Sequence, residues 1–154
     1  MKYTIPFLLF GNNLNLYIMC LITTKNIPEI AQEDIVCYKF YVLHKVNDII
    51  NLPSYDKDGY LSPYRGVPAP NINEVANTEL GKVHLYDSNI VMKGFHSYKY
   101  LDDLIKELYF WQSYDITIFK CIIPKGAKYY EGTFDESSSY CSESIILKET
   151  VDVE

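Results

Sequence analysis

The sequence predicts a single compact α+β domain with a mainly antiparallel β-sheet and one principal amphipathic helix at about residues 100–112. The chain has 154 residues, 48% of them hydrophobic, which is enough for one packed core. Several short segments rich in β-branched and aromatic residues are separated by turn residues, as is typical of antiparallel strands. Only one segment has helical periodicity, so we expect one helix to pack against the sheet.

The first strand is predicted at "IVCYKFYVLHKV", Ile35 to Val46, because β-branched and aromatic residues dominate it. Residues 47–80 follow as a long loop, since prolines and glycines there forbid a long helix or a central strand. These breakers are Pro53, Gly59, Pro63, Gly66, Pro68 and Pro70. A loop of that length is typically functional or disordered.

Two short strands are predicted in "KVHLYD" and "NIVMKGFHSY", with a turn at Asp87 to Asn89. The helix follows, ending near Gln112 or Ser113. Acidic residues in its first turn suit the positive end of the helix dipole. Its apolar positions, which recur with helical spacing, are Leu101, Leu104, Ile105, Leu108 and Trp111.

Three more strands are predicted after the helix. "DITIFKCIIP" is a strand that Pro124 stops, "KGAK" is a turn, "YYEG" is a short return strand, and "SESIILKETV" closes the sheet. The predicted order is therefore strand, long loop, two strands, helix and three strands. Residues 151–154 form an acidic tail.

Composition excludes some classes of function. A net charge of −6 with 22% charged residues argues against a disordered chain and against a protein that grips double-stranded nucleic acid through its backbone. The 15 tyrosines suit both sheet packing and stacking on flat ligands. Arg65 is the one arginine among 14 basic residues, a bias that AT-rich coding in a bacterium or its phage would produce.

The cysteines and the amino terminus bear on location. Four cysteines without a C-x-x-C pair or a histidine at zinc spacing do not predict a metal site, and they suit a reducing cytoplasm. The start of the chain lacks a cleavage site for a signal peptide and an apolar run of membrane-spanning length. Met19 is a second possible start of translation. We therefore expect residues 1–18 to be an upstream extension or an extra edge segment and residues 19–150 to be the domain.

Several motifs resemble those of a family of short uncharacterised proteins from gut Bacteroidetes and their phages. They are "MCLITTK", "GFHSYK", "CIIPKGAKYYEG" and "SESIILKE", and the resemblance runs from Met19 to the carboxyl end. No activity is attached to that family. The resemblance implies the source and the extent of the domain. If the chain is phage-encoded, the cytoplasm expected from its cysteines is that of the bacterial host.

The last thirty or so residues, "IPKGAKYYEG…SESIILKE", are also similar to the carboxyl-terminal part of small ADP-ribosyltransferase domains. That resemblance implies NAD as a cosubstrate. The catalytic glutamate of the motif falls on Ser144, so Glu143 serves only if a bulge brings it back to the same face. The arginine or histidine of the family's first strand corresponds to Lys39 or His44, and its serine-containing strand to residues 96–98.

The residues themselves indicate a different kind of site. His96 and Ser97 precede the helix, where unpaired backbone N–H groups and the helix dipole would favour a phosphate or carboxylate. If the long loop folds over this corner, Arg65 would add charge and Tyr60 or Tyr64 a stacking surface. A structural role is the open alternative for each of these residues.

Three classes of function remain open. The interpretation that we favour is a small non-catalytic binding protein, phage-associated or from a gut Bacteroidetes host, with no cofactor. It would bind a nucleotide-like anionic ligand or a host protein and so modulate host defence or metabolism. The alternatives are an ADP-ribosyltransferase-like enzyme that uses NAD, with Glu143 as its carboxylate, and a module for protein interaction or assembly.

Overall fold

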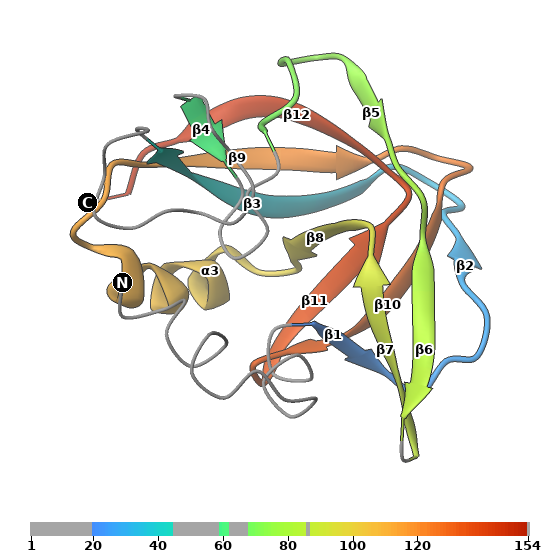
Figure 1. Ribbon diagram of the computed structural model, residues 1–154. Coiled ribbons are helices and arrows are strands. Elements are labelled where there is room, and N and C mark those ends of the chain that lie inside the picture. The colour runs from blue at the N-terminus through green and yellow to red at the C-terminus, as the bar shows by residue number, and fades with distance from the viewer. Residues whose placement is uncertain (1–19, 45–58, 62–67, 86, 154) are drawn as a thin grey trace.

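The computed structural model describes residues 20–44, 59–61, 68–85 and 87–153, without the side chains of residues 44, 59–61 and 85. Within these ranges the chain folds into one antiparallel β-sheet and one short helix, as Figure 1 shows. This confirms the predicted α+β fold class. The proposed upstream extension, residues 1–18, lies outside the described residues, and so do Tyr64 and Arg65.

The strands form one sheet in the order β5-β12-β9-β3-β8-β11-β10-β1-β7-β6, with β2 beside β10 and β4 beside β3. The bounds are β1 Leu21–Thr23, β2 Glu29–Ile30, β3 Ile35–His44, β4 Gly59–Leu61, β5 Val75–Asn77, β6 Gly81–Leu85, β7 Ser88–Lys93, β8 Phe95–Tyr98, β9 Ile116–Ile123, β10 Lys128–Phe134, β11 Ser137–Ser142 and β12 Ser144–Val151. The longest strand, β3, pairs with β9 over eight consecutive residues and so forms the centre of one half of the sheet.

The sheet is curled, and one segment bridges its two ends. β5 and β6 stand at opposite ends of the strand order, yet only residues 78–80 separate them in the chain. Figure 1 shows this segment descending from β12 to β7 along the right side of the molecule. The N–H of Thr78 donates to the carbonyl of Glu143 over 2.8 Å, which fixes the bridge to the junction of β11 and β12.

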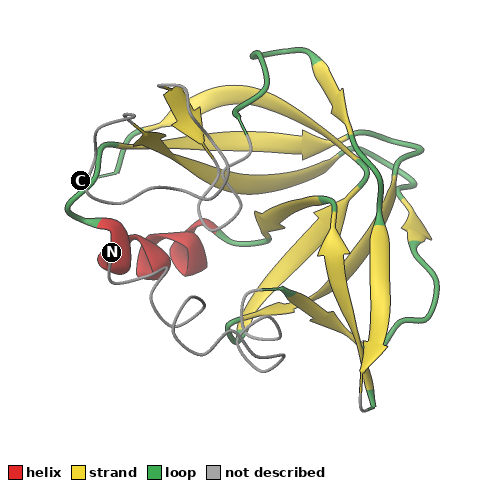
Figure 2. Ribbon diagram, in the orientation of Figure 1, coloured by secondary structure: helices red, strands yellow, loops and turns green. Residues whose placement is uncertain are grey.

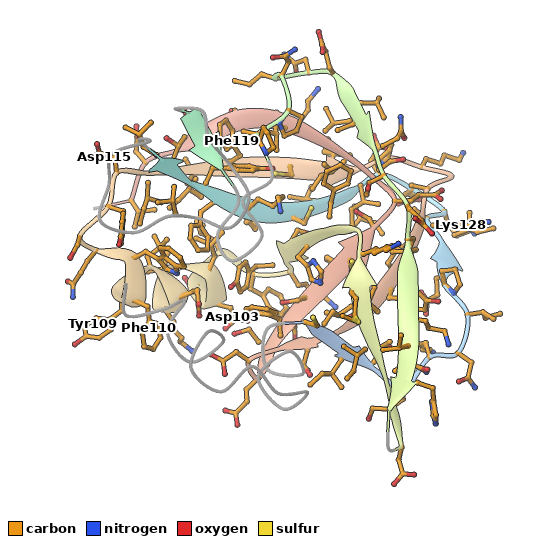
Figure 3. The ribbon with its side chains drawn as sticks, viewed as in Figure 1. Asp103, Tyr109, Phe110, Asp115, Phe119 and Lys128 are labelled. Atoms are coloured by element: carbon orange, nitrogen blue, oxygen red, sulfur yellow. The ribbon has the colours of Figure 1, made fainter. Side chains whose placement is uncertain are left out.

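The predicted helix is α3, Leu101–Leu108, which continues as a 3₁₀ turn over Tyr109–Trp111. It covers one face of β3 and β9, as Figure 2 shows. Leu104 and Trp111 are 0% and 1% exposed, and the Trp111 ring meets Phe40 edge to face with centroids 6.2 Å apart. Tyr109 and Phe110 lie on the outside of this turn (Figure 3). Among the described residues, no helix has the length and apolar character that crossing a bilayer requires.

Two predictions about the strands were wrong. Four strands follow the helix instead of three, because β11 has the sequence "SSSYCS", which lacks the hydrophobic alternation by which strands are recognised. It is specified by its hairpin: Asp135 and Glu136 both have positive φ, as a tight β10–β11 turn requires. The loop predicted at residues 47–80 also contributes two short strands, β4 and β5.

Gly94 divides the predicted strand "NIVMKGFHSY" into β7 and β8. Its φ of 139° lies in the region that favours glycine, and a Cβ at this position would lie 2.5 Å from the sulfur of Cys141. The chain therefore turns sharply at Gly94. As a result β7 pairs with β1 and β6, while β8 lies between β3 and β11.

Candidate functional site

His96 and Ser97, the residues predicted to bind an anion, lie in the middle of the sheet. Both belong to β8, where His96 is the cross-strand partner of Cys141 and Ser97 that of Tyr140. Ser97 is only 2% exposed. The helix begins four residues after Ser97, at Leu101, so the structure does not bring these two side chains to its amino terminus.

The amino terminus of α3 carries negative charge of its own. Its N-cap residue, Tyr100, makes no side-chain capping hydrogen bond, and Asp102 and Asp103 occupy the first turn. Carboxylates at this position interact favourably with the helix dipole. They would also repel a bound phosphate, so the described geometry does not support an anion site at this corner.

The His96 ring connects β1 to β11. Its Nε2 lies 3.4 Å from the backbone nitrogen of Leu21, from which it accepts a hydrogen bond, and its Nδ1 lies 3.8 Å from the sulfur of Cys141. An Nε2 that accepts implies the neutral tautomer with its proton on Nδ1, which then faces the sulfur. These contacts give His96 a structural role between two strands.

Of the other predicted site residues, the structure describes Glu143 fully and Tyr60 by its backbone. Tyr60 lies in β4, opposite Leu43 of β3, and its side chain is outside the described residues, as are Tyr64 and Arg65. The Glu143 carboxylate accepts the N–H of Lys128 over 3.0 Å. In Figure 3, Lys128 lies at the right side of the molecule, well away from Phe119 on β9. The structure therefore uses Glu143 to fix the start of β10.

The most unusual charged group is Lys39, which the predicted set of ligand-binding residues did not include. It lies on β3 opposite Phe119, is 8% exposed, and its Nζ donates a hydrogen bond to the carbonyl of His96. The ammonium also lies 5.4 Å from the centre of the Tyr41 ring, a cation–π distance. Strand alternation, which puts Lys39 on the same face as Cys37 and Tyr41, could have indicated a cation within the core.

The Lys39 ammonium has fewer acceptors than it has protons. Among the described residues, Lys39 forms no ion pair, and its Nζ donates a hydrogen bond to the His96 carbonyl. Burial lowers the pKa of Lys39, and nearby thiols partly oppose this effect. A buried ammonium without a carboxylate is costly, because an ion loses several kcal/mol of hydration when it leaves water.

Ser97 and two thiols adjoin Lys39. The register that pairs Tyr38 with Tyr98 puts Lys39 across from Ser97. The Ser97 hydroxyl is buried without a hydrogen-bond partner among the described residues, although its closeness to the Cys37 thiol helps to lower the pKa of that thiol. Cys37 faces Cys121 across β3 and β9. We call Lys39, Ser97, Cys37 and Cys121 the buried polar group.

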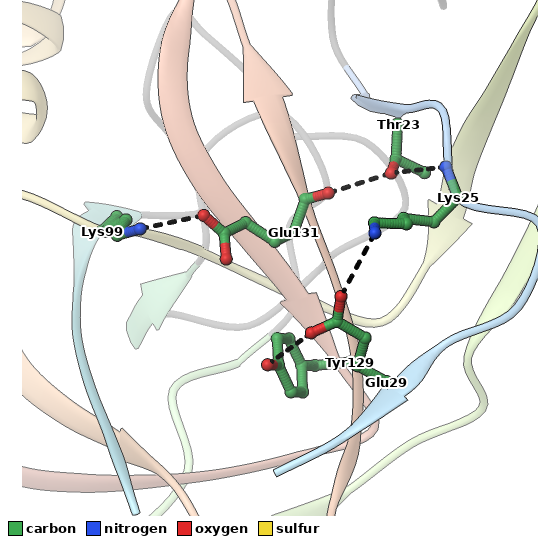
Figure 4. Close-up of polar contacts among 6 residues, drawn as sticks. All are labelled: Thr23, Lys25, Glu29, Lys99, Tyr129 and Glu131. Atoms are coloured by element: carbon green, nitrogen blue, oxygen red, sulfur yellow. Dashed lines mark hydrogen bonds and ion pairs between the residues drawn. The ribbon is translucent and has the colours of Figure 1, made fainter.

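A row of polar side chains leads from this group toward the surface. In register, Ser97 is opposite Tyr140, and Tyr140 is opposite Glu131, so the three share one face of β8, β11 and β10. Burial raises the pKa of Tyr140. Glu131 accepts a hydrogen bond from Lys99 over 2.9 Å, and this bond raises the pKa of Lys99 (Figure 4).

Figure 4 also shows the Glu29 carboxylate, which Tyr129 and Lys25 both contact. Tyr129 donates to Glu29 over 2.8 Å, and Lys25 pairs with the same carboxylate at 3.7 Å. Burial and the bond to Glu29 raise the pKa of Tyr129 to about 12. In the part of the chain that the structure describes, no three His, Cys, Asp or Glu side chains gather as metal ligands would.

Comparison with family models, with curated proteins and with solved structures found no match to this chain.

Proposed function

We propose that this protein is a small non-catalytic binding protein whose buried polar group anchors an anionic, nucleotide-like ligand. The observation that carries the proposal is the Lys39 ammonium, which is buried and has no ion pair with a carboxylate among the described residues. Phosphate oxygens would supply the missing acceptors. Charge-assisted hydrogen bonds of this kind are about twice as strong as neutral ones.

The Ser97 hydroxyl supports the same proposal. A buried hydroxyl without a partner costs about 1–3 kcal/mol in a folded protein, and such groups are kept where a ligand or water completes them. Ser97 lies beside Lys39 in the sheet, so one anionic group can accept hydrogen bonds from both. The expected biological setting remains a gut bacterium or its phage, in which such a protein would sequester a nucleotide-like molecule.

The test is a binding assay on the purified chain with ATP, ADP-ribose, NAD, cyclic nucleotides and pyrophosphate. Calorimetry should detect at least one ligand, and Lys39→Met should weaken it by about tenfold or more, the value of a charged hydrogen bond. Ser97→Ala should weaken it less, because one neutral donor is lost. Lys125→Met is the matched control, since Lys125 is an exposed residue in the turn before β10.

Two results would contradict the proposal. Binding that survives Lys39→Met would place the ligand elsewhere, and Arg65→Ala would then test the loop that the sequence suggests. If none of the ligands binds, a host protein becomes the better candidate partner, and capture with the purified chain as bait would be the next experiment.

A second candidate function is an ADP-ribosyltransferase-like enzyme, and one observation favours it. The resemblance implies a basic residue on the first strand beside a serine-containing strand, and Lys39 on β3 does lie beside Ser97 on β8. Glu143, however, is bonded to the Lys128 N–H. If Glu143 supported catalysis, Glu143→Gln would abolish the release of nicotinamide from NAD and leave the fold intact. Equal release by both proteins would remove Glu143 from the mechanism.

A further inference from the structure

Two buried cysteines stand directly opposite each other at the centre of the sheet. Cys37 of β3 and Cys121 of β9 are Cα partners, and each is 0% exposed. The pairing around them is regular, with eight consecutive partners from Ile35 and Ile123 to Val42 and Ile116. The described residues contain no disulfide. The two thiols are therefore held face to face by a continuous ladder.

The ladder fixes the spacing of the two backbones. Leu43 donates its N–H to the carbonyl of Asp115 over 2.9 Å, and this pair continues the β3–β9 register. Hydrogen-bonded and non-hydrogen-bonded pairs alternate along an antiparallel ladder. Cys37 lies six residues before Leu43, an even number, so the Cys37–Cys121 pair is also a hydrogen-bonded pair. Such pairs have Cα atoms about 5.5 Å apart, within the range of about 4.4–6.8 Å that disulfides span.

The side chains already interact. A hydrogen bond from Cys121 lowers the pKa of Cys37, and burial opposes this effect. The same hydrogen bond and burial raise the pKa of Cys121. Of the two thiols, Cys37 is the one whose pKa is lowered, and Cys121, whose Sγ donates to the Phe119 carbonyl over 3.5 Å, is its cross-strand neighbour. This is the arrangement of an attacking thiolate and a resolving thiol.

We propose that Cys37 and Cys121 are a redox-sensitive pair that closes to a reversible disulfide when the protein meets a peroxide. The Cys37 thiolate attacks one peroxide oxygen, the O–O bond breaks, and the departing hydroxide takes up a proton to become water. Cys37 is left as a sulfenic acid. Cys121 then attacks the Cys37 sulfur, the S–O bond breaks, and the hydroxide leaves with the Cys121 proton as a second water. The two thiols lose two electrons and the peroxide gains them.

The burial of the pair determines how the reaction proceeds. Because neither sulfur is exposed, the peroxide reaches Cys37 only when the sheet opens locally. The rate of oxidation should therefore stop increasing at high peroxide concentration. Ser97 and Lys39 border the pair, so the disulfide forms within the buried polar group. The proposal does not depend on whether that group binds a ligand.

The experiment oxidises the native full chain with hydrogen peroxide, blocks the remaining thiols after unfolding, and maps them by mass spectrometry. We expect two of the four thiols to be lost, with one linked peptide joining Cys37 to Cys121. A dithiol reductant should restore all four. Cys37→Ser and Cys121→Ser should each abolish the linked peptide, whereas Cys20→Ser should not.

Several outcomes would overturn the proposal. They are four unmodified thiols after exposure to peroxide, a linked pair that includes Cys20 or Cys141, and a Cys37 that oxidises irreversibly without a bond to Cys121. If the serine variants fail to fold, mapping of the unmodified sequence still decides the question, because the linked peptide identifies both cysteines directly.

Discussion

Lys39 is the residue whose environment departs furthest from what its type prefers. Replacing it with methionine keeps the length of the side chain and removes a buried charge. Exchanges of this kind are neutral or stabilising, so we expect Lys39→Met to leave the free energy of unfolding at neutral pH unchanged or raise it by about 1 kcal/mol. Urea denaturation measures this directly, and a loss of about 3 kcal/mol would mean that the ammonium stabilises the fold.

The same substitution predicts a pH dependence. Since burial lowers the pKa of Lys39, the unfolded chain holds that proton more tightly than the folded protein does. The unsubstituted protein should therefore gain stability relative to Lys39→Met as the pH rises from the folded pKa toward the ordinary value of 10.5. Denaturation of both proteins at about pH 7 and about pH 9.5 tests this sign, because the difference cancels most other titrations. A constant difference between the proteins would contradict it.

At the residue scale, the sequence predicts the strand that carries Lys39 but not the residues that surround it. The strand predicted from Ile35 is present as β3, and its alternation places Cys37, Lys39 and Tyr41 on one face, a signal that the sequence prediction did not use. The sequence does not show that β8 lies between β3 and β11, and only that placement buries Ser97 beside Lys39. The prediction for His96 and Ser97 rests on their distance to the helix, whereas their surroundings are set by strands far away in the chain.

At the scale of elements, β1 can lie against β10 only because residue 132 is glycine. This three-residue strand lies between β10 and β7, where Ile22 is opposite Thr133. A Cβ on Gly132 would lie 2.1 Å from the Ile22 carbonyl oxygen, a contact that real atoms do not make. The close approach of β1 and β10 therefore requires glycine at this position.

Gly132→Ala should consequently displace β1 and destabilise the protein. Overpacking of this kind costs about 1–3 kcal/mol, and the value should lie at the upper end because backbone has to move. Gly81→Ala is the matched control, since its Cβ would make only ordinary contacts, the nearest at 3.4 Å from the Lys93 side chain. Equal denaturation midpoints for the two variants would contradict a tight β1–β10 contact.

Elements with a strong local pattern were predictable and the others were not. β3, β9 and α3 match the predicted segments because their apolar residues repeat with the period of their own structure. β11, with four serines, has no such pattern, and it exists because the Asp135–Glu136 turn folds it onto β10. The strands β1, β2, β4 and β5 have two or three residues each, too few for any period to be visible.

At the scale of the whole molecule, the curled sheet couples three separate groups of core residues. Leu104 and Trp111 pack between α3 and the sheet, Ile123 and Leu147 pack with the buried cysteines, and Leu21 packs with Val91. β3 contributes to the first two groups, and the continuous strand order links both to the third. The bridge between β5 and β6 also joins the two ends of the sheet. Loss of one group should therefore weaken the others.

This coupling predicts a single cooperative unfolding transition. Trp111 is the only tryptophan, so its fluorescence reports the packing of α3, whereas far-ultraviolet circular dichroism reports mainly the sheet. Leu21→Ala, distant from Trp111 in the strand order, should lower the free energy of unfolding by about 2–5 kcal/mol in both signals alike. Val83→Ala, at a position 47% exposed on the edge strand β6, should change it by less than about 0.5 kcal/mol. If Leu21→Ala shifted the dichroism transition and left the Trp111 transition in place, the two halves of the sheet would unfold independently.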